Sequence, residues 1–207
     1  MNLRFSALTA AEVRAASFGA VKVPLTRSPN SWKEAEGTLF DPRTFGPERD
    51  WECACRKYVG EKHRHMICDV CGVKVAADAA ELRLRRFGHI NLFSAVEHPL
   101  VPGERMVVLP VLPISWRLGA HVEDLNRLYV NLVQTNTAFA SHAHEEVSRS
   151  EHAVAALVMN ERLSEALTER GRPLSSLLSF ALDAQGSRPE AFGVFLFAMG
   201  VKVTAES

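Results

Sequence analysis

The chain has 207 residues, of which 47% are hydrophobic and 23% are charged, a composition typical of a globular protein with a buried core. Lysine plus arginine and aspartate plus glutamate number 24 each, so the net charge gives no evidence of a nucleic-acid partner. No apolar run approaches the roughly 18 residues of a transmembrane helix, and charged residues interrupt any signal-peptide core at the N-terminus, so we expect a cytoplasmic protein with no membrane partner.

The first half of the chain is predicted to consist of short elements. In residues 1–52, prolines and glycines interrupt any helical period. Residues 53–98 contain all four cysteines and two short runs typical of strands, Gly72–Val75 and His89–Leu92. Four prolines surround the apolar run Met106–Leu112, which favours a strand or an extended connector over a helix.

The second half is predicted to be helical. Residues 123–140 and 145–169 are almost free of helix breakers, and Leu125, Leu128 and Leu132 have the spacing of one helix face. A short polar break separates the two segments, which favours an antiparallel helical hairpin. We therefore expect two regions, residues 1–104 with a metal-binding core over 50–76, and residues 105–207 with connector, hairpin and C-terminal tail. The tail contains an apolar stretch, 191–203, which must be buried against another part of the chain.

The cysteines form the pattern C-x-C, twelve intervening residues, C-x₂-C. Thiols are kept reduced in the cytosol, so a clustered, even-numbered set indicates a metal site before disulfides. Four thiolates suit tetrahedral Zn²⁺, and a closed shell of four sulfurs leaves no position for water, which predicts one structural zinc ion. The expected ligands are Cys53, Cys55, Cys68 and Cys71.

Three alternatives at this site remain open. An iron–sulfur cluster uses the same ligands, and four buried but unrelated cysteines would have no metal. His63 and His65 lie between the cysteine pairs and could replace a cysteine, or be surface residues of the loop. With the zinc interpretation, the sequence predicts an α+β fold, in which a small zinc-ribbon-like module with short β elements accompanies the helical hairpin.

Local charge separates two candidate binding surfaces. Residues 50–86 contain eight basic and six acidic side chains. This balance is compatible with a cationic surface that contacts phosphates and also with a solvated surface of mixed charge. The candidate phosphate contacts are Arg56, Lys57, Lys62, Arg64, Arg83, Arg85 and Arg86. Residues 123–170 contain eight acidic and four basic side chains. This acidic excess favours a protein partner over nucleic acid. The exposed hairpin face expected to bind it carries Asn126, Tyr129, Asn136, Glu146 and Arg149.

No catalytic motif is recognisable in the sequence. The six aspartates never form a D-x-D cluster, the arrangement that two-metal nucleotidyl transfer would require. A glycine-rich phosphate-binding loop is also absent. The sequence therefore assigns no catalytic residue and leaves open whether the protein is part of an enzyme.

The residues around the cysteines resemble a known family. The stretch Phe40–Tyr58, followed by Ile67–Val75, resembles the N-terminal zinc-binding region of the bacterial RNA polymerase β′ subunit. The likeness is strong over about 18–98, and residues 108–113 and 124–129 resemble the β′ segment that leads into the clamp coiled coil. In the family that coiled coil is the main docking site for sigma factor. The matching residues do not include the family's aspartate-rich catalytic motif.

This resemblance implies a role in transcription, for which three hypotheses remain. The first is a non-catalytic, clamp-like zinc protein that binds the polymerase core, sigma or a factor that docks on the clamp. The second is one fragment of a split β′ subunit whose catalytic parts lie on other chains. The third is a diverged remnant that retains only the zinc fold. DNA contact is compatible with the basic residues of the zinc module but is not required by any of the three.

Overall fold

The computed structural model describes residues 2–25, 29–98, 101–117, 123–142, 197 and 200–206. Its internal contacts group the chain into two units. The first unit contains residues 1–15, 91–110 and 134–207, and the second contains residues 16–90 and 111–133. Strands and helices are mixed in chain order, which confirms the predicted α+β class. The predicted regions 1–104 and 105–207 stay a prediction.

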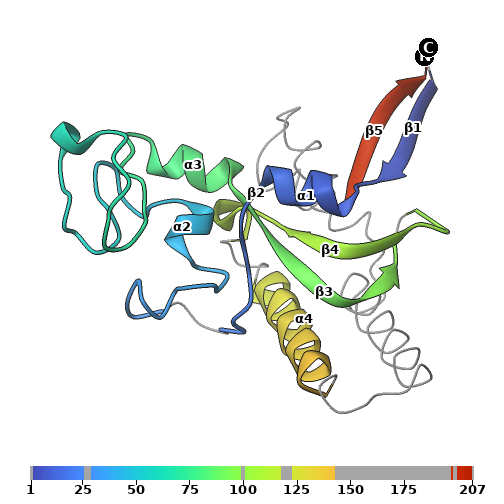
Figure 1. Ribbon diagram of the computed structural model, residues 1–207. Helices are drawn as coiled ribbons and strands as arrows, with labels where there is room; N and C mark the ends of the chain where they lie inside the picture. Colours follow the sequence, from blue (N-terminus) through green and yellow to red (C-terminus); the bar gives the residue numbers. More distant parts are fainter. Residues whose placement is uncertain are drawn as a thin grey trace. The chain divides into compact units, whose positions relative to one another are not determined.

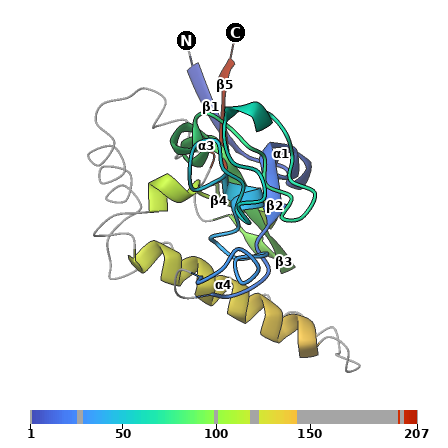
Figure 2. The ribbon, with the colours of Figure 1, turned by 90° about the vertical axis from the view of Figure 1, so that its left-hand side faces the viewer.

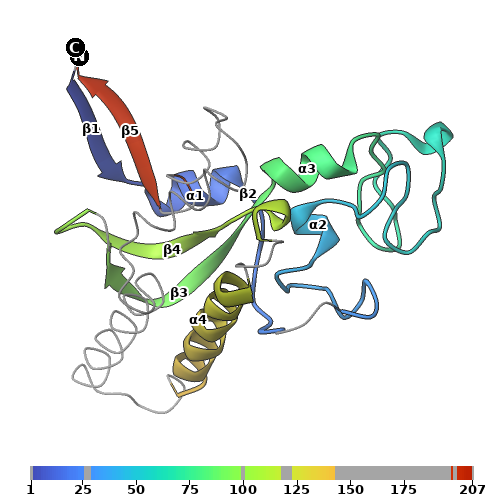
Figure 3. The same ribbon diagram turned by 180° about the vertical axis from the view of Figure 1, so that it is seen from behind.

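In the first unit, a two-stranded sheet joins segments from opposite ends of the sequence. Strand β1 (Asn2–Ala7) pairs antiparallel with β5 (Val201–Glu206), with Phe5 opposite Val203. The two strands lie side by side in every view (Figures 1 and 3). Valine, phenylalanine and threonine, which favour the pleated backbone, are present in this pair. Part of the apolar stretch 191–203 is therefore paired with the first strand of the chain.

Helix α1 (Ala10–Ala16) begins at a reciprocal cap. The Thr9 hydroxyl accepts a hydrogen bond from the Glu12 N–H (3.2 Å), and the Glu12 carboxylate accepts one from the Thr9 N–H (2.7 Å), a capping box. Lys202 of β5 also donates to the Glu12 carboxylate (2.7 Å). The hydrogen bonds from Lys202 and then Thr9 lower the pKa of Glu12 to about 2. One carboxylate thus anchors both the helix start and β5.

A second sheet has the strand order β2–β3–β4. Strand β2 (Ser17–Ala20) runs parallel to β3 (Phe87–Glu97), with Ser17 opposite Phe87. Gly88, Ile90 and Leu92 are buried on β3 while Asn91 is exposed, as expected where one sheet face packs on a core. Strand β4 (Arg105–Val111) confirms the extended structure predicted for the proline-flanked run. Within the described residues, no helix has both the length and the apolar character needed to cross a membrane.

In the second unit, the cysteine-bearing loops follow one short helix and precede another in the chain, and they project to one side of both helices (Figure 1). Helix α2 (Pro42–Phe45) is capped by the carboxylate of Asp41, and proline is favourable at its first position because that N–H has no helical partner. The loops include one 3₁₀ turn, η1 (Glu61–His63), and end at α3 (Ala79–Arg85). The first N–H of α3 donates to the carboxylate of Asp50 (2.8 Å). A residue at the entrance of the loops therefore caps the helix at their exit.

Helix α4 (Glu123–His142) confirms the first helix of the predicted hairpin and is drawn as one continuous helix in Figure 2. Val130, Leu132 and Val133 are buried, while Arg127 and Asn131 are exposed, so the helix has one apolar face. The side chains of the other two leucines of the predicted seam lie outside the described residues. The predicted second helix, 145–169, also lies outside them.

A buried guanidinium holds distant parts of the second unit together. Arg117, the last residue of the 3₁₀ helix η2 (Ile114–Arg117), is 1% exposed. It donates to the Leu39 carbonyl (2.6 Å), the Leu112 carbonyl (2.8 Å) and the Asn126 side-chain oxygen (2.8 Å), and it lies over the Phe45 ring at 4.5 Å. Burial lowers the pKa of Arg117. The hydrogen bonds offset the desolvation of its charge.

Arg117→Met is expected to destabilise the protein by about 3 kcal/mol, because one buried and two half-buried oxygens lose their donor. The matched control is Arg85→Met on α3, whose side chain is 68% exposed and pairs with Glu81; an exposed pair contributes less than about 1 kcal/mol. Urea unfolding followed by circular dichroism measures both variants. Equal midpoints for the two variants would show that the buried network contributes nothing beyond a surface ion pair.

Candidate metal centre

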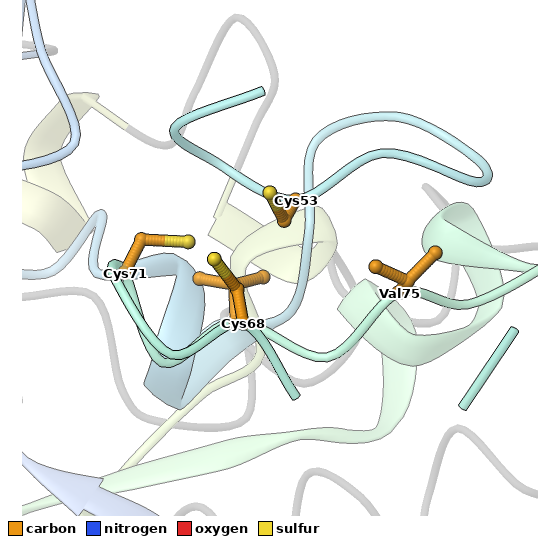
Figure 4. Close-up of a cluster of buried hydrophobic side chains, with 5 residues drawn as sticks. Cys53, Cys68, Cys71 and Val75 are labelled. Carbon is orange, nitrogen blue, oxygen red and sulfur yellow. The ribbon is translucent and has the colours of Figure 1, made fainter. Parts of the chain in front are cut away.

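The candidate metal centre is built from two tight turns that face each other. In the first, the Cys53 N–H donates to the Tyr58 carbonyl (3.1 Å), and the Tyr58 N–H donates to the Cys53 sulfur (3.3 Å). In the second, the Cys68 N–H donates to the Val73 carbonyl (3.0 Å), and the Gly72 N–H donates to the Cys68 carbonyl (2.8 Å). Each turn thus directs its cysteine side chains inward, and the sulfurs of Cys53, Cys68 and Cys71 converge in Figure 4.

The sulfur geometry fits tetrahedral coordination. All four cysteines are free thiols, and their sulfurs lie within 4.8 Å of one another. The Cys55 sulfur lies 3.7 Å from that of Cys53 and 3.6 Å from that of Cys68. A tetrahedral ion with metal–sulfur distances of about 2.3 Å requires sulfurs about 3.8 Å apart. Among the described residues, these cysteines are the one group of three or more histidine, cysteine or acidic side chains that could hold a metal ion.

The surroundings of the sulfurs are dry and apolar. Cys53, Cys68 and Cys71 are at most 2% exposed and pack with Val73 and Val75, which are fully buried. Half-buried side chains complete this small cluster, namely Trp32, Ala54, Cys55 and Tyr58. Without a bound cation, four thiolates in such a place would be unstable, because burial disfavours the charged form.

The pKa values of the thiols reflect two opposed effects, burial and hydrogen bonding to the thiolate. Burial raises the pKa of Cys53 and raises that of Cys55 to about 12. Burial also opposes ionisation of Cys68, but the N–H groups of Cys71 and Val70 stabilise its thiolate, and the pKa of Cys68 falls to about 7. A metal ion that binds here must displace the remaining thiol protons, so metal affinity should increase with pH.

Neither histidine of the loop belongs to the cysteine cluster. The His63 ring packs against the Tyr58 ring at a centroid distance of 4.9 Å. His65 is exposed and has a left-handed backbone (φ 66°), and its N–H donates to the Val75 carbonyl. The arrangement thus favours the alternative in which both are residues of the loop surface.

The candidate phosphate contacts have different environments. Three of them form ion pairs with acidic neighbours: Arg56 with Glu52, Lys57 with Asp69, and Arg85 with Glu81. Arg86 donates to the carbonyls of Arg43 and Thr44, and burial lowers the pKa of both Arg83 and Arg86. Lys62 and Arg64 are exposed. The seven residues therefore do not form one uniform cationic face.

The predicted partner face on the hairpin needs one correction. Tyr129 was expected to be exposed, but it is 5% exposed, and its hydroxyl accepts a hydrogen bond from the Leu112 N–H (3.4 Å). Asn126 bonds to Arg117, and the Asn136 amide bonds to the backbone of β3. These polar groups satisfy backbone groups of neighbouring segments. The other two members of the face, Glu146 and Arg149, lie outside the described residues.

Sequence reasoning missed two residues that shape the centre. Trp32 packs on the cysteine cluster from a loop about twenty residues upstream, and no local pattern indicates such a contact. Beside it lies a cavity of about 350 Å³, lined by Trp32, Glu48, Arg49, Glu52 and Arg56 among others. The second residue that sequence reasoning missed is Arg43, whose aliphatic stem lies against the turn at Gly72. Arg43 forms an ion pair with Asp41 (3.0 Å). The opposite charges two residues apart are the sequence signal by which Arg43 could have been identified.

Three proteins similar to this chain are β′ subunits of DNA-directed RNA polymerase. The DNA-directed RNA polymerase subunit beta' of Rhodopirellula baltica is 45% identical over 97 residues, or 47% of this chain and 7% of that protein. The subunit beta' of Lactobacillus gasseri is 41% identical over 106 residues, or 49% and 8%. That of Corynebacterium aurimucosum is 31% identical over 197 residues, or 92% and 14%. The chain thus spans about a tenth of the length of these relatives. No family model matches it.

Gly72→Ala is expected to lower the affinity of the centre for a divalent metal about tenfold. Gly72 has φ +69°, a left-handed conformation that disfavours a side chain, and a Cβ there would lie 3.1 Å from Cδ of Arg43. Gly103→Ala is the control, since that glycine has φ +82°, open space around it and no cysteine nearby. Titration with Co²⁺, followed by its thiolate absorption, compares the two variants with the parent. Equal affinities in all three would contradict a role for this turn in preorganising the sulfurs.

Proposed function

We propose that this chain, a homologue of part of the bacterial DNA-directed RNA polymerase β′ subunit, is a zinc-stabilised, non-catalytic module that takes part in transcription by binding another protein. The observation that carries the proposal is 31% identity to a β′ subunit over 92% of the chain. The partner is the polymerase core, sigma or a factor that docks on the clamp. The same homology supports a cytoplasmic location.

Zinc is the metal that the donor set favours. Four sulfurs at tetrahedral spacing, three of them nearly inaccessible to water, suit a closed structural site. The ion would be held by Cys53, Cys55, Cys68 and Cys71 and would join the two turns. Its contribution is to folding, because four coordination positions filled by protein leave none for a reacting water.

The chemistry of the chain supports binding and not catalysis. The aspartates of the sequence are dispersed, whereas nucleotidyl transfer requires clustered carboxylates for two magnesium ions. What the chain offers for binding is helix α4 and the cysteine module. A non-catalytic protein of this kind would act by occupying a surface that β′ itself uses, or by joining the assembly.

Purified protein is expected to contain about one zinc ion per chain, measured by elemental mass spectrometry. Cys68→Ser should lose the metal and become poorly soluble, because the free energy of structural zinc binding, on the order of 10 kcal/mol, is also folding free energy. Ser94→Ala, a small change on β3 outside the centre, should retain the ion. Iron with visible absorbance would instead indicate an iron–sulfur cluster, and absence of any metal would contradict the zinc site.

The binding proposal is tested with purified components. The zinc-loaded chain is expected to co-elute in gel filtration with the core polymerase or with sigma, and not to synthesise RNA by itself on any template. If a core enzyme prepared without the chain synthesises RNA only after the chain is added, the protein is instead a fragment of a split β′ subunit. If neither the core, nor sigma, nor a factor that docks on the clamp retains the chain at micromolar concentration, the proposed function is wrong.

A further inference from the structure

One surface of the zinc module combines exposed aliphatic and basic side chains. We define the 62–74 face by Lys62, Arg64, Met66, Ile67, Val70 and Lys74, all of which are exposed. Ile67 is 68% exposed, Val70 52% and Met66 42%. Single exposed aliphatic residues are ordinary, but here three fall within five consecutive positions of one small module, and we refer to these three as the patch.

The backbone directs Ile67 and Lys74 away from the metal centre. The two residues pair across an antiparallel bridge, and the neighbours of this pair, Cys68 and Val73, are buried with the sulfurs. Side chains alternate across such a pair, so the inner face makes the centre and the outer face carries Ile67 beside Lys74. Val70 lies in the turn between Cys68 and Cys71. The metal site thus fixes the backbone beneath the patch.

The basic side chains of this face are not neutralised by ion pairs with other described residues. Within the described residues, no ion pair involves Lys62, Arg64 or Lys74, whereas Lys57 pairs with Asp69 (2.6 Å) next to the patch. Arg64 lies over the Trp51 ring at 5.9 Å, which leaves its charge without a counter-ion. The exposed acidic residues here are Glu61 and Asp69. Asp69 is neutralised by Lys57, so Glu61 is the one that offsets part of the charge of the three cations. The face therefore has a net positive charge of two.

The aliphatic component distinguishes between two kinds of partner. Phosphate contacts are made by arginine, lysine and hydroxyl groups, and an isoleucine that stays 68% exposed gains nothing beside a sugar–phosphate backbone. Against a protein, the same side chain is removed from water in the apolar centre of an interface, and lysines at the rim meet opposite charge. The composition of the face fits a protein whose surface carries an apolar patch with an acidic rim.

We propose that the 62–74 face is the docking surface for an acidic protein partner, with Ile67 at its centre and Lys62, Arg64 and Lys74 at its rim. This proposal rests on the proposed function, namely that the chain binds a protein of the transcription apparatus. It assigns the contact to the zinc module and not to the helical hairpin. It also gives the metal a second consequence, because the ion orders the turn that presents the patch.

The test uses the full zinc-loaded chain, with core polymerase and sigma as separate probes, by titration at about 0.05 M and 0.5 M salt. Ile67→Thr keeps a β-branched side chain but removes apolar surface, and it should weaken binding about fivefold to tenfold at both salt concentrations. Lys74→Glu should weaken binding at least as much at low salt, with a much smaller effect at high salt. The controls are Val23→Thr and Lys33→Glu, exposed residues of the same unit, which should bind like the parent.

Zinc content and unfolding midpoint are measured for every variant, so that loss of binding is not confused with loss of folding. Unchanged binding of both variants to a probe that the parent binds would overturn the proposed face while the proposed function stands. If the parent binds neither probe and also fails to bind a factor that docks on the clamp, the proposed face and the proposed function are both overturned. Binding of a DNA duplex that is lost with Lys74→Glu but unaffected by Ile67→Thr would assign the face to nucleic acid. Self-association that Ile67→Thr abolishes would assign it to a second copy of the chain. Either result would overturn the proposal.

Discussion

Four sulfur atoms within 4.8 Å of one another impose the condition on which the rest of the zinc module depends. The two turns that carry them have little else to hold them, since their strand pairing consists of isolated bridges between Glu52 and Val59 and between Ile67 and Lys74. The apolar cluster beneath is small, with Val73 and Val75 as its fully buried aliphatic members. A module of this size cannot bury enough surface to fix its loops without a further cross-link. A cation bound by all four sulfurs would supply this cross-link.

Around the module, polar side chains connect its ends to the second unit. Asp50 caps α3 across the whole length of the cysteine loops, and Arg86 donates to carbonyls of α2. Arg117 joins the loop before α2 to the start of α4 through Leu39 and Asn126. Each of these side chains satisfies backbone groups that a loop would otherwise leave unpaired. The position of the metal centre on the unit is therefore determined by hydrogen bonds as much as by apolar packing.

The sequence was most informative where the determining signal is local. Cysteine spacing predicted the set of four sulfurs, the proline-flanked apolar run predicted β4, and the leucine period predicted α4, all within about twenty residues each. The capping box of Thr9 and Glu12 is an equally local pattern, with its two residues three positions apart. Arg117 could not be predicted to be buried, because its acceptors at Leu39 and Asn126 are brought to it by the fold. Tyr129 was assigned to the wrong side of α4 for the same reason: periodicity identifies the apolar face, but the structure decides which polar residues lie at its edge.

The pairing of β1 with β5 has a consequence for the order of assembly. Asn2 lies opposite Glu206, so the chain between them must be closed into a loop of about two hundred residues, at an entropic cost that grows with length. The cysteine turns, by contrast, involve residues at most 18 positions apart, from Cys53 to Cys71. During synthesis on the ribosome the metal centre can therefore form soon after Cys71 has emerged, whereas β1 has no partner strand until Val201–Glu206 has followed. An unpaired strand edge invites aggregation, and for β1 that exposure lasts for the synthesis of all the residues between the two strands.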